Sequence, residues 1–357
     1  MITISLCMIV KNEEHTLARC LSCVDKIADE IIIVDTGSTD RTKEIASRFT
    51  TSIYDFPWQD DFSAARNFAF SKATCTYWLW LDADDILTEE NQQKLLAFKE
   101  TATPNFDVAM LRYHTAFDAE GKPTFSYFRE RIIRRVPTNP WEGAVHEVIT
   151  PFGNVIQLDI AVSHKKDRPS DSNRNLNIYK ALAQRGHTFT PRETYYYARE
   201  LYYHGHFQQA EEQFSLFLAD ESGWVENKIE TCQLLAYCLY NLGQSSEALT
   251  ALFASFAFDA PRAEVCCDIG KHFFDRGQYR LSLYWYHQAY DTPWDEGNTG
   301  FQLPDCYDYI PALQLAVCYY RLGNLEKAIS FNEIAGKAKP HSEAYEKNRV
   351  FFQGLLP

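Results

Sequence analysis

Residues 77–85 read YWLWLDADD: five apolar side chains are followed by Asp82, Ala83, Asp84 and Asp85. A continuous apolar run of this kind is typical of a strand covered on both faces, as in a parallel sheet. Three carboxylates this close together repel one another and resist the loss of water. The arrangement therefore predicts a buried strand whose end holds a cation.

The sequence around this strand alternates between two kinds of hydrophobic pattern. Strand-like runs are predicted at 3–10, 30–35, 51–56, 77–82 and 106–113, and helical spacing is predicted at 13–24, 38–49, 60–73 and 88–100. Such alternation predicts an α/β fold with a mostly parallel sheet and helices on both faces. Ligands of such sheets bind beyond the carboxyl ends of the strands. Polar residues follow the strands at 11–13, 35 and 82–85, so the site is expected there.

A repeat appears after about residue 190. Gly205, Gly243, Gly277 and Gly323 each follow an aromatic residue by three positions, and small residues recur seven positions before and five after each glycine. This pattern resembles the tetratricopeptide repeat, a pair of helices whose arrays form concave binding surfaces. We therefore expect an α/β domain over 1–168, a linker and first helix over 169–190, and an all-α repeat domain over 191–357.

Composition excludes several classes of protein. The chain of 357 residues carries a net charge of -13 and has 24 Phe, 21 Tyr and 7 Trp, which is enough for two folded domains and argues against disorder. It has no Lys/Arg-rich run, so nucleic acid is not an expected partner. No apolar run approaches the length of a membrane span, and the first residues do not look like a leader. Ten irregularly spaced cysteines suggest reduced thiols and a cytoplasmic location.

Four segments occur in an order that resembles a known family. They are SLCMIVKNEE, EIIIVDTGSTDRT, DDFSAARN and WLWLDADD. Together they resemble family-2 glycosyltransferases with the GT-A fold, and most closely the bacterial branch of lipopolysaccharide-core glucosyltransferases and bacteriocin peptide glycosyltransferases. The resemblance covers roughly residues 1–165. It implies an inverting transferase that moves a hexose from a UDP-sugar with the help of Mn²⁺ or Mg²⁺.

The resemblance also implies roles for individual residues. Asp84 is expected to bind the metal, and His164 is a further candidate ligand. The remaining donor-side residues are expected to line the nucleotide-sugar: Val10, Asn12, Glu13, Asp35, Arg66, Asn67, Asp82 and Ala83. A cation bound by both residues 82–85 and the donor diphosphate would explain why the carboxylates gather at the end of the strand.

Inverting transfer also needs a general base on the acceptor side. The segment WEGAVHEVI, residues 141–149, offers Glu142, His146 and Glu147. Family members usually carry an acidic pair in this region, whereas this chain has His146 and Glu147. We assign the base to Glu147 and keep Glu142 and His146 as alternatives. An ordinary amphipathic segment without a catalytic role is the competing interpretation.

The acceptor is not fixed by the sequence. The sequence has no basic amphipathic helix of the kind that binds a membrane surface. This favours a peptide or protein side chain as the acceptor over a glycan or a lipid-linked sugar. The repeats are expected to recognise the acceptor or to join two chains into a homodimer. A catalytically inactive scaffold is the alternative from another class. A nucleotidyltransferase would need a Gly-rich basic loop after the first strand, and VKNEEH is acidic and lacks glycine.

Overall fold

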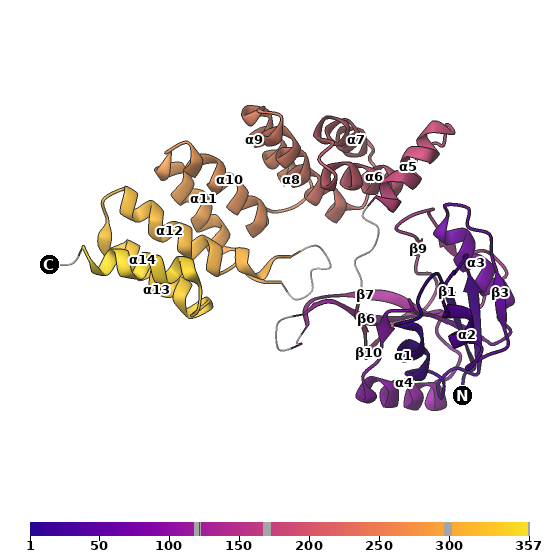
Figure 1. Ribbon diagram of the computed structural model, residues 1–357. Helices are drawn as coiled ribbons and strands as arrows, with labels where there is room; N and C mark the ends of the chain where they lie inside the picture. Colours follow the sequence, from indigo (N-terminus) through magenta and orange to yellow (C-terminus); the bar gives the residue numbers. More distant parts are fainter. Residues whose placement is uncertain (118–120, 122, 167–172, 296–301, 356–357) are drawn as a thin grey trace. The chain divides into compact units, whose positions relative to one another are not determined.

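A computed structural model describes residues 1–117, 121, 123–166, 173–295 and 302–355 (Figure 1). The chain forms two compact units, Met1–His187 and Thr188–Pro357. The predicted boundary at residue 168 lies outside the described residues. Helix α5 (Arg174–Gln184), which lies in the segment predicted as a linker and first helix, is grouped by its contacts with the first unit.

The first unit is built on one eight-stranded sheet with the order β3-β2-β1-β4-β7-β6-β10-β5. Strands β1 (Ile4–Val10), β2 (Glu30–Asp35), β3 (Ile53–Asp55) and β4 (Tyr77–Trp80) are parallel to one another. Strands β6 (Val108–Phe117) and β10 (Val155–His164) form a second parallel pair. Strand β7 (Pro123–Arg134) lies antiparallel between β4 and β6, and the two-residue strand β5 (Asp85–Ile86) pairs antiparallel with β10.

Helices cover both faces of the sheet, as the sequence predicts. One core contains Leu6 and Met8 of β1 together with side chains of α1 (Leu17–Ser22), α2 (Thr42–Ala46) and α4 (Glu89–Thr101). The opposite core joins Cys7 of β1 to α3 (Phe62–Lys72) through Ala69 and Phe70. Successive β1 side chains enter opposite cores because strand side chains alternate in direction. The apolar run of β4 is divided in the same way.

The strand order places the crevice of the sheet between β1 and β4. The chain runs from β1 outward to β2 and β3 and then returns to the other side of β1 as β4. In open α/β sheets this reversal separates the loops that follow the two strands and leaves room for a ligand at their carboxyl ends. The loop after β1 and the turn after β4 flank this point.

The second half of the sheet was not expected in detail. The sequence predicted strand β6 but not β7, β10 or the small pair of β8 (Trp141–Glu142) and β9 (Val148–Ile149). Strand β7 enters between β4 and β6 and so carries Arg129, Glu130 and Arg131 beside Trp80, at the end of β4. The sheet is therefore mixed, although the parallel arrangement dominates.

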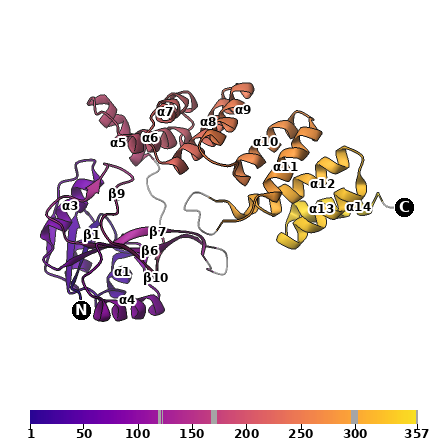
Figure 2. The same cartoon turned by 180° about the vertical axis from the view of Figure 1, so that it is seen from behind.

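The second unit consists of paired helices that follow one another along the chain (Figure 2). The described pairs are α6 (Pro191–Tyr203) with α7 (Phe207–Ala219), α8 (Val225–Asn241) with α9 (Ser245–Ala254), α10 (Ala263–Asp275) with α11 (Tyr279–Asp291), and α12 (Tyr309–Arg321) with α13 (Leu325–Ala338). Helix α14 (Glu343–Gln353) follows the last pair. Each pair corresponds to one predicted repeat.

The repeat glycines lie at the turn inside each pair. Gly205, Gly243, Gly277 and Gly323 have φ angles of 74°, 77°, 69° and 82°. The residue after each glycine donates its N–H to a carbonyl of the preceding helix, for example Gln244 to Leu239 at 2.8 Å, which closes the helix end in the left-handed cap geometry. The small residues are buried where the two helices meet, and a Cβ at Gly270 would lie 3.0 Å from the Tyr286 ring. In the described part of the chain, no helix is both long and apolar enough to cross a bilayer.

Candidate active site

The acidic turn links β4 to β5 and is closed by two hydrogen bonds. The Asp85 backbone N–H donates to the Asp82 carbonyl, and the Asp82 backbone N–H donates to Asp85 Oδ2, each at 3.0 Å. Ala83 is buried beneath the turn. The side chains of Asp82 and Asp84 are 33% and 19% exposed, whereas that of Asp85 is fully buried. The three neighbouring carboxylates therefore have different environments.

Asp85 is held by partners within the protein. Its Oδ2 lies 3.0 Å from Nη1 of Arg131 on β7, and both side chains are inaccessible to solvent. Its Oδ1 accepts a hydrogen bond of 2.9 Å from the Tyr113 hydroxyl. Burial and the nearby carboxylates raise the pKa of Tyr113 well above its usual range, so this hydroxyl remains a donor. Sequence reasoning named neither Arg131 nor Tyr113, because both come from strands whose position beside the turn depends on the sheet order.

His164, the last residue of β10, stands next to Asp84. Its Nδ1 lies 3.2 Å from Asp84 Oδ1 and 3.2 Å from Asp85 Oδ1. Burial opposes the charged imidazolium, but the two carboxylates outweigh this effect and raise the pKa of His164 to about 9. One ligand atom from each of Asp84, Asp85 and His164 falls within 4.8 Å of the others.

These residues fit a hard divalent cation. Carboxylate oxygens suit Mg²⁺ and Mn²⁺, and imidazole nitrogen is accepted by first-row transition metals. Asp84 and His164 are partly exposed and can turn toward an ion. The oxygens of Asp85 are already used by Arg131, Tyr113 and the turn, so Asp85 is better suited to support the two ligands than to bind the metal itself.

The end of β2 carries a buried carboxylate with spare hydrogen-bonding capacity. Asp35, paired with Val10 of β1, is 1% exposed, and its Oδ1 accepts from the backbone N–H groups of Gly37 and Ser38 at 2.9 Å each. Its Oδ2 is buried and has no hydrogen-bond partner among the described residues, and Lys43 Nζ stands 4.0 Å from Oδ1. A buried acceptor of this kind is costly unless a ligand satisfies it.

The loop after β1 is fixed against the loop after β2. Asn12 has a φ of 57°, its backbone N–H donates to Ser38 Oγ at 2.9 Å, and its Oδ1 accepts from the Thr39 N–H at 2.8 Å. Burial raises the pKa of Glu13; a hydrogen bond from Thr16 opposes the shift, and the charge of Asp84 adds to it. Glu13 therefore lies within electrostatic reach of the acidic turn.

Arg66 and Asn67 on α3 make contacts that the sequence did not predict. Arg66 is 7% exposed, and its Nε and Nη2 donate to Glu147 Oε1 at 2.7 Å and to Asp82 Oδ1 at 2.8 Å. Burial works against both charges, but the ion pairs prevail: the pKa of Arg66 is raised and that of Asp82 is held well below its usual range. Asn67 exchanges two hydrogen bonds with the backbone of Trp141, at 2.9 and 3.1 Å.

The three candidates for the base in segment 141–149 have different environments. Glu147 is 13% exposed and lies beside Asp82 through their shared partner Arg66. Glu142 is exposed on β8, opposite Val148. His146 is partly buried and has a φ of 52°, a left-handed conformation that sets the direction of the chain just before Glu147. Of the three, Glu147 is the one that the structure brings to the acidic turn.

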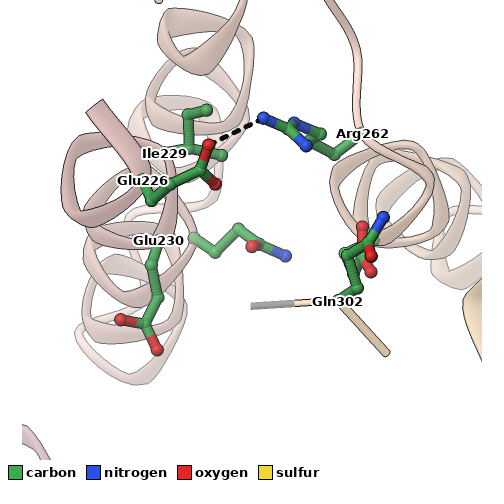
Figure 3. Close-up of a pocket in the computed structure, with 7 residues that line it drawn as sticks. Glu226, Ile229, Glu230, Arg262 and Gln302 are labelled. Carbon is green, nitrogen blue, oxygen red and sulfur yellow. Dashed lines mark hydrogen bonds and ion pairs between the residues drawn. The ribbon is translucent and has the colours of Figure 1, made fainter. Parts of the chain in front are cut away.

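A separate small pocket lies in the repeat domain, between α8, α10 and the segment before α12 (Figure 3). Its polar lining includes three carboxylates that already have partners. Glu226 pairs with Arg262 at 2.9 Å, Glu230 accepts from the Tyr195 hydroxyl, and Glu264 accepts from the Leu303 N–H at 2.7 Å. Burial raises the pKa of Glu230 to about 7.

Comparison with known proteins identifies the first unit. The model of glycosyl transferase family 2 matches residues 5–153. The glycosyltransferase SunS of Bacillus subtilis is 27% identical over 227 residues, which cover 56% of this chain and 49% of SunS. An uncharacterized glycosyltransferase of Rickettsia typhi is 37% identical over 92 residues, 26% of this chain and 31% of the relative. A TPR repeat-containing protein of Synechococcus elongatus is 49% identical over 90 residues, 25% of this chain and 22% of its own length.

Solved structures similar to the chain include helical-repeat proteins. The C-terminal part of a TPR repeat-containing protein from Cytophaga hutchinsonii has a TM-score of 0.41 at 16% identity, covering 51% of this chain and 65% of that one. YrrB, a TPR protein with an unusual peptide-binding site, has a TM-score of 0.38 at 17% identity and covers 50% and 84%. The chain spans about half or less of the curated relatives it matches. Its residues 5–153 form a glycosyl transferase family 2 domain, which this chain joins to a C-terminal domain of tetratricopeptide-like repeats.

Proposed function

We propose that this chain is a metal-dependent inverting glycosyltransferase that moves a hexose from a UDP-sugar to an acceptor. The observation that carries the proposal is the grouping of Asp84 and His164 within one cluster, at the strand ends of a family-2 glycosyltransferase domain. An inactive scaffold would have no need for accessible carboxylates concentrated at this point of the sheet. Donor, metal and acceptor are parts of the proposal.

On the donor side, we assign the nucleotide to the crevice between β1 and β4. Asp35 would accept a hydrogen bond from the uracil or ribose, and its unpartnered Oδ2 supports this assignment. Val10, Asn12 and Glu13 bound the same crevice after β1, and Asp82 and Ala83 bound it after β4. The low pKa of Asp82 keeps this side chain an acceptor, as contact with a ribose hydroxyl requires.

Asp84 and His164 would hold Mn²⁺ or Mg²⁺. When bound, the cation would offset the negative charge that grows on the leaving UDP. The residues of this chain supply the rest: Asp85, which Arg131 holds, contacts His164 at 3.2 Å and would orient it toward the cation. The carboxylate suits either ion, whereas the imidazole favours manganese, which is a transition metal.

On the acceptor side, we assign the general base to Glu147. A base must lie within hydrogen-bond reach of the proton that it removes, or within reach through one water. Glu147 and Asp82 both contact Arg66 but come from different segments of the chain. This suits a base that acts on the acceptor, on the side of the donor opposite the metal. The proton of the acceptor group would pass to Glu147 Oε2, because Oε1 accepts the hydrogen bond from Arg66.

We propose a peptide or protein side chain as the acceptor, recognised by the repeat domain. Exposed aromatic side chains on this domain include Tyr203, Trp224 and Tyr284, and such side chains provide much of the binding energy at protein interfaces. Replacing them should reduce transfer while UDP-sugar hydrolysis persists. A glycan or lipid-linked acceptor is the alternative, and a homodimer would instead appear as a change in mass on replacement.

UDP release tests the proposal directly. The chain is incubated with UDP-glucose, UDP-galactose and UDP-N-acetylglucosamine, each with Mn²⁺, with Mg²⁺ and with EDTA. We expect slow metal-dependent UDP release from at least one donor, with water as the acceptor, and faster release when the true acceptor is added. No UDP release and no UDP binding under any condition would favour the scaffold, and release undiminished by EDTA would rule out the metal.

A further inference from the structure

Two neighbouring residues of α3 are both directed at the segment 141–149. Asn67 Nδ2 donates to the Trp141 carbonyl at 2.9 Å and Asn67 Oδ1 accepts from the Trp141 N–H at 3.1 Å, so one side chain holds both backbone polar groups of this residue. Arg66 reaches six residues further along the segment and binds Glu147. From these contacts we propose that Arg66 and Asn67 are positioning residues, which fix the acceptor-side segment and direct the carboxylate of Glu147. The inference rests on the proposed role of Glu147 as the base.

The guanidinium of Arg66 packs against two indole rings. Its Cζ lies 4.9 Å from the ring centroids of both Trp80 and Trp141, and these two rings meet edge to face at 5.0 Å. The Trp80 ring also contacts Arg131, whose Cζ lies 3.7 Å from its centroid and 4.3 Å from that of Tyr113. Trp80 therefore connects Arg131, which holds Asp85, to Arg66, which holds Asp82 and Glu147.

This enclosure argues against direct contact between Arg66 and the donor. Nε and Nη2 are used by Glu147 and Asp82; the remaining nitrogen, Nη1, is buried from solvent and has no hydrogen-bond partner among the described residues. To reach a diphosphate, the guanidinium would have to leave both indole rings and two carboxylates. A planar guanidinium with its donors directed at two carboxylates is instead suited to hold their mutual orientation, which a lysine cannot reproduce.

The Glu147 side chain takes its direction from Arg66, whereas the backbone around it is also held by the Phe62 N–H, which donates to the Ala144 carbonyl at 2.9 Å, and by the Tyr179 hydroxyl, 3.4 Å from the Val145 carbonyl. Glu147 lies in the irregular stretch between the two-residue strands β8 and β9. Gly143 (φ 91°) and His146 (φ 52°) leave the usual backbone regions within this stretch. Arg66 and Asn67 connect it to α3, a helix of 11 residues packed on the sheet. A displacement of about 1 Å at a catalytic group can cost on the order of 100-fold in rate.

The test is a double-mutant cycle between Arg66→Lys and Glu147→Gln in the full chain. Turnover is measured as UDP release at saturating UDP-sugar, with water as the acceptor and the best donor of the panel. The UDP dissociation constant in Mn²⁺ is measured separately by calorimetry. Arg134→Lys is the matched control, because Arg134 pairs with Asp107 at 2.9 Å and lies at the end of β7 paired with the start of β4, away from the acidic turn.

If Arg66 acts through Glu147, Arg66→Lys lowers turnover about 10- to 100-fold. Because Arg66 also holds Asp82, the proposed ribose contact, the UDP dissociation constant rises as well, but by less than about tenfold. In the Glu147→Gln background the same substitution then has little further effect on turnover. Asn67→Ala keeps the buried charges paired and replaces Arg66→Lys in the test if that variant does not fold. We expect Asn67→Ala to lower turnover about 3- to 10-fold. This loss should also be absent in the Glu147→Gln background. Arg134→Lys leaves both quantities unchanged.

Two results would overturn the inference. One is a tenfold or larger rise in the UDP dissociation constant with turnover preserved at saturating donor, which would make Arg66 a donor ligand. The other is that Arg66→Lys and Asn67→Ala each lower turnover in the Glu147→Gln background by the same factor as in the native chain. Normal turnover of Glu147→Gln alone would instead refute the assignment of the base, so failure of the inference and failure of the proposed function give different results.

Discussion

The two domains bury carboxylates in different ways. Around the acidic turn, Asp82 and Glu147 share Arg66, and Asp85 pairs with Arg131. In the repeat domain, Asp268 accepts from the Tyr237 hydroxyl at 2.5 Å and from Gln233 Nε2 at 2.8 Å, and Glu230 accepts from Tyr195 with the Arg199 guanidinium 3.8 Å away. The acidic turn compensates charge with charge, whereas Asp268 and Glu230 of the repeat domain rely mainly on neutral donors.

The pKa shifts follow this difference. Burial alone raises the pKa of a carboxyl group, and it does so for Glu230, Asp268 and Glu264 of the repeat domain. At Asp82 the same burial is outweighed by Arg66 and Arg131, and the pKa falls. Fixed negative charge is what a cation-dependent site needs, whereas carboxyl groups that can take up a proton near neutral pH suit a packed interface between helices.

The largest effect is expected from removing the accessible carboxylate of the turn. Asp84→Ala deletes a proposed cation ligand together with its charge, so UDP release should fall below detection and Mn²⁺-dependent binding of UDP should weaken. Asp159→Ala is the control, because Asp159 is an exposed carboxylate on β10 paired with Lys94. Full activity of Asp84→Ala, or of the native chain in EDTA, would contradict the metal assignment.

The second effect concerns the carboxylate on the other side of Arg66. Glu147→Gln keeps the shape of the side chain but cannot accept a proton, so turnover should fall about 100-fold or more while the affinity for UDP is nearly unchanged. Rates and UDP calorimetry would be measured together with those of Glu142→Gln. If Glu142→Gln loses turnover and Glu147→Gln does not, the base is Glu142.

The third effect is a change of stability with pH that depends on Glu230 of the repeat domain. The pKa of Glu230 is about 7 in the folded chain against an ordinary value of 4.5. The folded state therefore binds this proton more tightly than the unfolded state, and native stability falls as pH rises from about 4.5 to 7. Glu230→Gln should remove the loss and stabilise the chain above pH 7 by about 1–3 kcal/mol.

Calorimetric melting of the full chain at pH 5 and pH 8 measures this difference. We expect Glu230→Gln to raise the melting temperature at pH 8 and to have little effect at pH 5. Glu247→Gln is a suitable control, because Glu247 lies at the exposed start of α9. An equal shift of Glu230→Gln at both pH values would show that packing, and not ionisation, is responsible.

The smallest effect is expected at the start of the repeat domain. Thr190 and Glu193 form a capping box: the Glu193 N–H donates to Thr190 Oγ1 at 3.3 Å, and the Thr190 N–H donates to Glu193 Oε2 at 2.8 Å. Thr190→Ala should cost about 1 kcal/mol of stability. Urea unfolding followed by circular dichroism would detect it, and unchanged UDP release would show that the loss stays within the repeat domain.

Local sequence patterns determined much of the architecture. Alternating apolar runs and helical spacing predicted β1 to β4, β6 and α1 to α4, because each element is set by its own periodicity. The repeat glycines predicted four helix turns, since a left-handed residue is required where each helix ends and glycine adopts that conformation without strain. The acidic turn was identified because three carboxylates after an apolar strand are unfavourable without a cation.

Only the tertiary structure decided which of these charges meet. Arg66 and Glu147 are 81 positions apart, and Asp85 and Arg131 are joined because β7 enters the sheet antiparallel beside β4. No local pattern specifies such pairs: an arginine on a helix can face solvent, a ligand or a carboxylate with the same periodicity. The strand order fixes the choice, because it brings two indole rings and two carboxylates around one guanidinium. These groups compensate for the loss of water around the buried charge.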